Sequence, residues 1–236
     1  MHAIILAGGR GTRLWPYTVA IPKPLVPIGD LPILEIVVRQ LARAGFTRVT
    51  LAVNHQADII RAYCGDGSKW GAKIDYSLES IALGTMGPLK LVHDLPDNFL
   101  VMNGDILSDV DYGAMLAGHE AQRALFSVAA AEREHQVDYG VLEVDSNDGL
   151  TGFREKPKTR FLVSMGIYCV NRRTLDWIPE AKPFGFDQLM LALIDARQRV
   201  IVRRHEGYWL DIGRPDDYQR AVDEWPELAP RLLPVT

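Results

Sequence analysis

A glycine-rich segment that carries only positive charge follows the first apolar run of the chain. The run Ala3–Leu6 leads into AGGRGTR, and PKP follows a short distance later. From Gly8 to Gly29 there are three cations, Arg10, Arg13 and Lys23, and no carboxylate. Glycines let backbone N–H groups approach phosphate oxygens closely, and Arg and Lys neutralise their charge. The segment is therefore typical of a polyphosphate-binding loop.

Two better-known phosphate loops fit this segment poorly. A Walker A loop needs a Lys directly after its second glycine, and none is present. The dinucleotide fingerprint is half present, since Gly9 and Gly11 match but Leu14 occupies the third glycine position. The structural alternative is a strand-to-helix turn that needs positive φ at its glycines. A dinucleotide-dependent oxidoreductase stays open as a distant functional alternative.

Two aspartates are candidates for holding a metal ion near such a loop. Asp105 follows the apolar run FLVM and the dipeptide Asn103-Gly104, and Asp211 follows the aromatic and apolar run YWL. Mg²⁺ bound to a triphosphate needs one or two protein carboxylates, because phosphates and waters complete its octahedron. The alternative is that each aspartate caps a turn or helix, which is a common role for Asp.

Two further segments hold unusual combinations of residues. ALGTMGP, residues 82–88, places two glycines before a helical pattern. FREKP, residues 153–157, places Glu155 beside Lys156 and before a proline. For the second segment, a solvated turn is the plain structural interpretation.

Composition excludes several classes of function. The chain has 236 residues, of which 47% are hydrophobic, and a net charge of −4. A nucleic-acid-binding protein needs a basic face, which no run of Lys or Arg supplies here. No apolar run is long enough to span a membrane, and the N-terminus lacks the charged and apolar regions of a signal peptide. The two cysteines, Cys64 and Cys169, are far apart, so we expect neither a disulfide framework nor a structural zinc site, and a cytoplasmic location.

Apolar strands alternate with amphipathic helices in the first half. This alternation predicts a mostly parallel sheet that is covered on both faces. Ligands of such sheets bind beyond the carboxyl ends of the strands, where the glycine-rich segment and Asp105 would both lie. The predicted strands are His2–Leu6, Arg48–Val53, Ile74–Ser77 and Phe99–Met102, and the predicted helices are Ile33–Ala44, Gln56–Cys64, Gly84–His93 and Tyr112–Gln122.

The second half is richer in strands. It predicts a mixed sheet edge or a small β subdomain laid over the first half. The final helix is expected from Asp216 to Trp225, with Pro215 suited to its first turn. The predicted strands are Phe126–Ala131, Gly140–Val144, Leu150–Arg154, Val163–Val170 and Val200–Arg204.

These motifs together resemble those of the sugar-1-phosphate nucleotidyltransferases, also called nucleotide-sugar pyrophosphorylases. The resemblance starts with LAGGRGTRLWPYTVAIPKPLVPIG and continues in order through LGTMGPL, NGD, YGVLEVD, FREKP, SMGIYCVN and WLDIGRPDDY. It implies a Rossmann-like three-layer α/β fold with a mixed, mostly parallel sheet and a small β subdomain over the sugar site. It also implies one domain spanning residues 1–236 and transfer of a nucleotidyl group from an NTP to a sugar 1-phosphate, with release of pyrophosphate.

The resemblance assigns expected roles to individual residues. The nucleobase, ribose and triphosphate would be bound by Leu6, Ala7, Gly8, Gly9, Gly11, Thr12, Arg13, Glu79 and Gly84. Arg13, Lys23 and Asp105 would be the catalytic residues, with Arg13 on the leaving pyrophosphate and Lys23 on the α-phosphate or the incoming phosphate. Asp105 and Asp211 would hold Mg²⁺, and Gly140, Glu155 and Lys156 would bind the sugar phosphate.

The sequence departs from the family pattern at two places. The family often shows LGTAG, whereas this chain has Met86 in place of the alanine and Pro88 after the second glycine, which leaves the base pocket open. Longer relatives append a β-helix or a helical extension. No hexapeptide repeat is present, so we expect neither a fused acyltransferase nor control through such an extension.

Glu79 gives a hint about the nucleobase. A carboxylate accepts hydrogen bonds and therefore suits the adjacent N1–H and N2–H donors of guanine, whereas uracil and thymine offer one N3–H. We therefore expect GTP, with UTP or dTTP as the alternative. The stretch DGSKWG, residues 66–71, resembles guanylyltransferases that act on mannose- or heptose-type 1-phosphates, but also uridylyl- and thymidylyltransferases. That resemblance implies a mannose- or heptose-type 1-phosphate as the acceptor. A non-catalytic nucleotide-binding module of the same fold is a further alternative, although it would be expected to have lost Arg13, Lys23 or Asp105. Family habit alone favours a homodimer.

Overall fold

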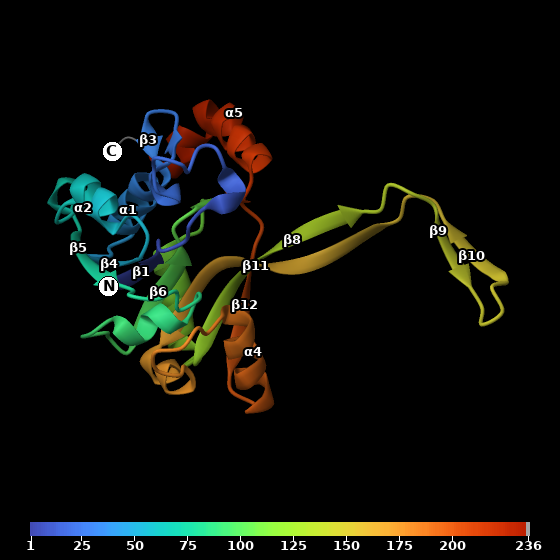
Figure 1. Cartoon of the computed structure of the whole chain (residues 1–236). Coiled ribbons are helices and arrows are strands. Elements are labelled where there is room, and N and C mark those ends of the chain that lie inside the picture. The colour runs from blue at the N-terminus through green and yellow to red at the C-terminus, as the bar shows by residue number, and fades with distance from the viewer. Residues whose placement is uncertain (235–236) are drawn as a thin grey trace.

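A twisted sheet of seven strands forms the centre of the molecule (Figure 1). The structure is a computed structural model, and it describes residues 1–234. The strands lie in the order β12-β8-β11-β6-β1-β4-β5. Their bounds are β1 His2–Leu6, β4 Arg48–Val53, β5 Lys73–Leu78, β6 Asn98–Asn103, β8 Phe126–Gln136, β11 Lys158–Asn171 and β12 Val200–His205.

The sheet is mostly parallel. Strands β5, β4, β1 and β6 run in parallel, β11 is antiparallel to both β6 and β8, and β12 is parallel to β8. Side chains alternate between its two faces. Ile5 thus packs into one hydrophobic cluster and Ile4 into the other, and both are fully buried. The expected three-layer α/β architecture with a mixed, mostly parallel sheet is confirmed.

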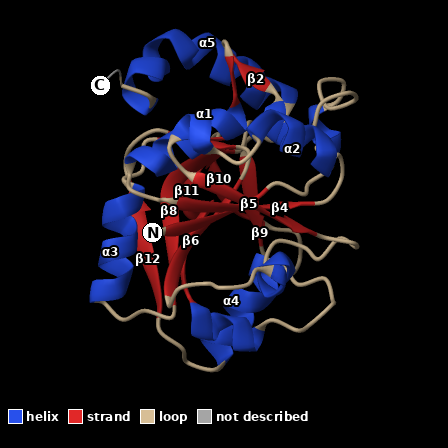
Figure 2. Ribbon diagram, turned by 90° about the vertical axis from the view of Figure 1, so that its left-hand side faces the viewer, coloured by secondary structure: helices blue, strands red, loops and turns tan. Residues whose placement is uncertain are grey.

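Helices cover both faces of this sheet (Figure 2). One hydrophobic cluster joins the sheet to α1, α2, α3 and α5, and the other joins it to α4. The bounds are α1 Ile33–Arg43, α2 Ala57–Cys64, α3 Tyr112–Ala121, α4 Phe186–Asp195 and α5 Pro215–Leu232. Within residues 1–234, no helix combines the length and the apolar character that crossing a membrane requires.

Three pairs of short strands lie outside the main sheet. The first is β2 (Pro27–Ile28) with β3 (Leu31–Pro32), and the second is β7 (Ile106–Ser108) with β13 (Trp209–Asp211). The third is the hairpin of β9 (Val141–Val144) and β10 (Leu150–Arg154). It lies at the end of a ribbon formed by β8 and β11, which projects from the body of the molecule (Figure 1). A small β unit is therefore present as expected, but its expected placement over the first half is wrong, because the ribbon carries it away from the body (Figure 1).

One predicted helix is wrong. Residues Gly84–His93 form no α-helix, and the structure has a short 3₁₀ segment at Gly87–Leu91 instead. Pro88 lacks the N–H that an α-helix would use, and Gly84 takes a positive φ of 78°. Helix α4 was not predicted, although Leu189 and Leu193 show helical spacing and are both fully buried.

Candidate functional site

A cleft opens where four parallel strands end. The carboxyl ends of β1, β4 and β6 are level, because Leu6 pairs with both Ala52 and Asn103. The cleft has a volume of about 560 Å³. Its walls come from the loops after β1, β4, β5 and β6 and include Leu6, Gly8, Gly9, Arg10, Asn54, Glu79, Ser80, Gly84, Asn103 and Asp105.

The loop after β1 approaches the end of β5 closely. A Cβ atom on Gly8 would lie 2.8 Å from Glu79 Oε1, so this position requires glycine while Glu79 stays where it is. Ala7 extends β1 by donating its N–H to Ala52 O over 2.8 Å. Gly11 is left-handed with φ of 64° and precedes the 3₁₀ turn Thr12–Leu14. Glycine is favoured there because side chains are strained in that region.

Lys23 points into the same region from a second turn. It begins the 3₁₀ turn Lys23–Leu25, where Leu25 is buried and holds the turn against the core. Lys23 is itself buried, and its ammonium contacts Asp105 Oδ2. A buried charge needs a partner to offset its loss of hydration, and Asp105 supplies one.

Asp105 and Asp211 lie side by side although 106 positions separate them in the chain. Strand β7 pairs with β13 so that Asp211 faces Ile106, and Ile212 N donates to Asp105 O over 3.0 Å. Packed surroundings raise the pKa of Asp211, and repulsion from Asp105 raises it further. Lys23 and Arg13 act in the opposite direction on the same carboxyl. The site therefore places two carboxylates together, and nearby positive charge favours the ionised form of Asp211.

Arg13 also lies near Asp211. A Cβ on Gly213 would be 3.6 Å from Arg13 Nη2, so the guanidinium reaches the WLDIGR segment. The structure thus brings Arg13 and Lys23 of the glycine-rich segment together with Asp105 and Asp211, from three separate parts of the sequence.

The two aspartates fit a magnesium ion. Asp105 Oδ1 is buried and has no hydrogen-bond partner among the described residues, which is costly unless something binds it. Residues 1–234 contain no cluster of three or more His, Cys, Asp or Glu that could hold a metal on its own. A pair of carboxylates completed by phosphate oxygens is what Mg²⁺ commonly uses, so the donor set suits a metal brought with a nucleotide.

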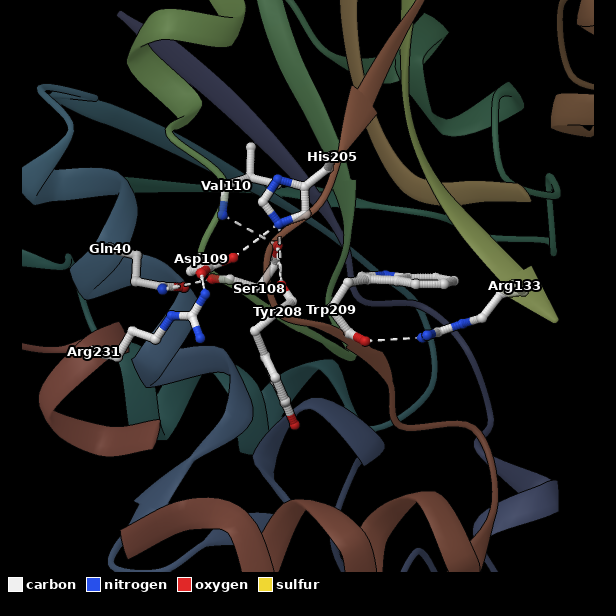
Figure 3. Close-up of polar contacts among 9 residues, drawn as sticks. All are labelled: Gln40, Ser108, Asp109, Val110, Arg133, His205, Tyr208, Trp209 and Arg231. Carbon is white, nitrogen blue, oxygen red and sulfur yellow. Dashed lines mark hydrogen bonds and ion pairs between the residues drawn. The ribbon is translucent and has the colours of Figure 1, made fainter. Parts of the chain in front are cut away.

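A polar network holds β13 in place (Figure 3). Ser108 Oγ donates to Tyr208 O over 3.1 Å, and His205 Nε2 lies 2.8 Å from Asp109 Oδ1. Arg133 Nη2 donates to Trp209 O over 2.9 Å, and its guanidinium lies 4.4 Å from the centre of the Trp209 ring. The network ties the strand that carries Asp211 to β7 and to the root of the ribbon.

A second cavity of about 500 Å³ lies at the root of the ribbon. Its walls include Arg133, Arg204, His205, Tyr208 and Trp209. Several of these residues are the ones that support β13 (Figure 3). The cavity contains neither Asp105 nor Asp211 and therefore lies apart from the cluster described above.

Glu79 and Gly84 line one wall of the cleft. Glu79 is buried, its Oε2 accepts from Leu83 N over 3.1 Å, and burial raises its pKa. Gly84 approaches the segment before α4 so closely that a Cβ would lie 2.8 Å from Phe184 O. Both residues therefore line the cleft, and their contact with a nucleobase stays a prediction.

Gly140, Glu155 and Lys156 are not part of this cluster. They lie where the projecting hairpin joins the ribbon, away from the sheet edge (Figure 1). The structure does bring two of them together, since a Cβ on Gly140 would be 3.3 Å from Glu155 Oε2. None of the three lines the cleft.

Asn54 lines the cleft and was missed, whereas Asn103 was expected at this edge of the sheet but was given no role. Asn54 directly follows β4, and Asn103 ends β6 beside Asp105. The signal was available, because a polar residue at the carboxyl end of a buried parallel strand faces the ligand edge.

The family is decided by comparison with known proteins. The family model described as Nucleotidyl transferase matches residues 2–227. A relative named probable mannose-1-phosphate guanylyltransferase 1, from Oryza sativa subsp. japonica, is 36% identical over 92% of this chain and 63% of its own length. This chain belongs to the nucleotidyl transferase family.

Other members of the nucleotidyl transferase family differ in the nucleotide that they are named for. A relative named UTP–glucose-1-phosphate uridylyltransferase, from Synechocystis sp., is 32% identical over 94% of this chain and 62% of its own length. The crystal structure of HddC from Yersinia pseudotuberculosis has a TM-score of 0.75 at 27% identity, covering 95% of this chain and 99% of that one. The chain spans slightly over 60% of the length of the curated relatives named here.

Proposed function

We propose that this chain transfers a nucleotidyl group from an NTP to a sugar 1-phosphate and releases pyrophosphate. Membership of the nucleotidyl transferase family supports the reaction class, and relatives named as guanylyl- and uridylyltransferases of sugar 1-phosphates support the substrates. The observation that carries the proposal is the cluster of Arg13, Lys23, Asp105 and Asp211 beside a cleft at the carboxyl ends of the strands.

The reaction needs charge neutralisation more than covalent chemistry. An oxygen of the sugar phosphate attacks the α-phosphorus in line, the bond from that phosphorus to the bridging oxygen breaks, and pyrophosphate leaves. Lys23 neutralises the α-phosphate or the incoming phosphate, while Arg13 stabilises the leaving pyrophosphate. Backbone N–H groups of the loop from Gly8 to Gly11 position the triphosphate.

Asp105 and Asp211 would hold Mg²⁺ in this reaction. The unpartnered Oδ1 of Asp105 and the adjoining carboxylate of Asp211 are the oxygen ligands that the ion prefers. Mg²⁺ bound there supplies charge neutralisation at the phosphates. When no ligand is bound, the Lys23 ammonium contacts Asp105 Oδ2 and offsets the negative charge of that carboxylate.

GTP is the proposed nucleotide, with a mannose- or heptose-type 1-phosphate as acceptor. Glu79 lies in the cleft wall and offers carboxylate oxygens to the two adjacent N–H donors of guanine. The guanylyltransferase names of several relatives agree with this, as does a structure of HddC described as complexed with GMP-PN, at 26% identity and a TM-score of 0.72. UTP is the second candidate, favoured by the Synechocystis relative.

A substrate screen tests the proposal. Five NTPs are each combined with a panel of hexose and heptose 1-phosphates, and pyrophosphate release is measured with Mg²⁺ and with EDTA. We expect release with GTP and a mannose-type 1-phosphate that needs the metal. Release with UTP or dTTP but not with GTP would overturn the proposed base, and no release with any pair would overturn the reaction.

A further inference from the structure

The ribbon of β8 and β11 holds the hairpin at a distance from the body. Strand β12 pairs with β8 as far as Ala131. Beyond Ala131, β8 and β11 pair with each other and with no further strand of the described residues. Their pairing continues to Gln136 and Lys158, which is roughly 17 Å further at the rise of an antiparallel strand. The hairpin is therefore carried clear of its own sheet edge (Figure 1).

Ion pairs across the ribbon stabilise this extended arrangement. Lys158 Nζ lies 2.8 Å from Glu134, and Arg160 lies 3.5 Å from both Glu132 and Glu134. Each exposed pair contributes little alone, but the series adds to a continuous backbone ladder. The hydrogen bonds and ion pairs that residues 138–156 make within the described chain all join this segment to itself. Reaching its own cleft would require the ribbon to break.

The hairpin carries an uncovered apolar face. Leu142 pairs with Phe153 and Val144 with Leu150, and all four side chains are more than half exposed. An isolated two-stranded sheet has no second layer for its apolar face and is marginal in water. This face therefore needs a cover that the rest of its own chain does not provide.

The loop 10–22 beside the cleft complements the hairpin in its exposed apolar side chains and in its charge. Trp15, Tyr17, Val19 and Ile21 are exposed on the segment between Arg13 and Lys23. The loop 10–22 carries the cations Arg10 and Arg13 and no carboxylate, whereas residues 137–157 hold five carboxylates and two cations. An apolar and acidic hairpin thus matches an apolar and cationic loop, and unlike charges favour this pairing over hairpin on hairpin.

We propose that the hairpin of one copy docks on the loop 10–22 of a second copy and completes the second copy's site with Gly140, Glu155 and Lys156. The contact is reciprocal, so one two-fold axis closes the dimer. The apolar and polar groups lie together, since a Cβ on Gly140 would be 2.6 Å from the Phe153 ring and 3.3 Å from Glu155 Oε2. The sugar-phosphate role of these three residues rests on the proposed function, whereas the docking rests on the surfaces.

Complementation between two inactive variants tests the exchange. Asp105→Ala removes the cleft function and keeps the hairpin, while Lys156→Ala removes the hairpin function and keeps the cleft. The two variants are co-expressed with different tags, purified through both tags, and assayed for pyrophosphate release. Each variant alone should be inactive, and the mixed dimer should regain roughly half of the wild-type activity, because one of its two sites is complete.

The outcomes separate this inference from the proposed function. If both single variants are inactive and no mixed dimer is recovered, or the mixed dimer is inactive, the exchange is overturned and the proposed function stands. If Asp105→Ala keeps normal activity, the proposed function itself fails. Normal activity of Lys156→Ala also overturns the exchange. The matched control is Lys73→Ala on β5, at the far edge of the sheet, which should keep wild-type activity. In sedimentation velocity, Leu142→Glu/Phe153→Glu should be monomeric where the wild type is a dimer, and a wild-type monomer would also overturn the proposal.

Discussion

Lys23 and Asp105 show how single residues adapt this site to a charged substrate. The ammonium and the carboxylate are close partners, yet Asp105 Oδ1 stays buried and unpaired. Under the proposed function, Asp105 Oδ1 would bind the metal and the phosphates would attract Lys23. The two residues would then hold each other in position until substrate binds and change partners when it does.

Glu79 carries the prediction about the nucleobase. Glu79→Gln replaces one acceptor oxygen by an N–H donor that would face the donors of guanine. We expect the ratio of kcat/KM for GTP over UTP to fall by roughly 10- to 100-fold, which corresponds to losing a hydrogen bond to a charged group. The steady-state assay uses both nucleotides, with the exposed Glu180→Gln as control. An unchanged ratio would show that Glu79 does not select the base.

His119 carries a prediction about acid stability. It is fully buried beside Ser127, and burial followed by the charge of Arg203 lowers its pKa to about 4. Because the unfolded chain binds this proton near pH 6.5, the free energy of unfolding falls as pH drops from about 6.5 to 4, by up to about 3 kcal/mol. Urea titrations should show a shallower pH dependence for His119→Gln than for wild type. An identical dependence in both, with exposed His93→Gln as control, would contradict it.

At the scale of elements, close backbone approaches shape the cleft. The turn after β5 contacts the segment before α4, where Met86 N and Gly87 N both donate to Phe184 O over 2.9 and 3.1 Å. Gly84 permits this contact because it adopts a positive φ and because any side chain there would collide with the backbone of Phe184. The cleft wall that contains Glu79 and Gly84 therefore depends on the segment that leads into α4, which is far away in sequence.

A matched pair of glycine variants separates these two contributions. Gly84 and Gly71 have φ of 78° and 77°, but a Cβ at Gly71 meets no atom within 4 Å. Gly71→Ala should cost about 1–2 kcal/mol of unfolding free energy from the backbone alone. Gly84→Ala should cost more and also raise the KM for the nucleotide, as measured by denaturation and steady-state kinetics. Equal losses in both variants would contradict the close approach.

The sequence supports the elements near the start of the chain better than the later ones. Strands at His2–Leu6 and Arg48–Val53 could be predicted because continuous apolar runs end in polar or glycine-rich loops. The helix expected at Gly84–His93 was wrong because Pro88 and the positive φ of Gly84 oppose an α-helix, while backbone contacts with Phe184 fix the turn. Strand β13 is three residues long, so its pairing with β7 and hence the meeting of Asp105 and Asp211 depend on tertiary structure.

At the scale of the whole molecule, the body and the hairpin are structurally separate. Both hydrophobic clusters lie in the body, and neither includes a residue from 137–157. No motif in the sequence indicates that this segment projects. The resemblance to the family instead assigns its residues Gly140, Glu155 and Lys156 to the sugar site. Its direction is set by the ribbon's register and by the bulge between Ser164 and Tyr168.

Removing the hairpin should leave the body folded. Residues 138–156 are replaced by Asn-Gly, which suits a tight turn between β8 and β11. Because no core residue is lost, its melting temperature should lie within about 2 °C of that of Leu142→Glu/Phe153→Glu, which keeps the hairpin but not its apolar face. Differential scanning calorimetry compares the two chains. A large loss of stability in the excised chain would show that the hairpin packs on its own body.

Identification of the product tests the central claim most directly. The wild-type chain is incubated with GTP, mannose 1-phosphate and Mg²⁺, and products are separated by anion-exchange chromatography and identified by mass spectrometry. We predict equal amounts of GDP-mannose and pyrophosphate, with turnover reduced at least 100-fold in both Lys23→Ala and Asp211→Asn. Formation of GDP and free phosphate without a nucleotide sugar, or undiminished turnover in both variants, would contradict the account.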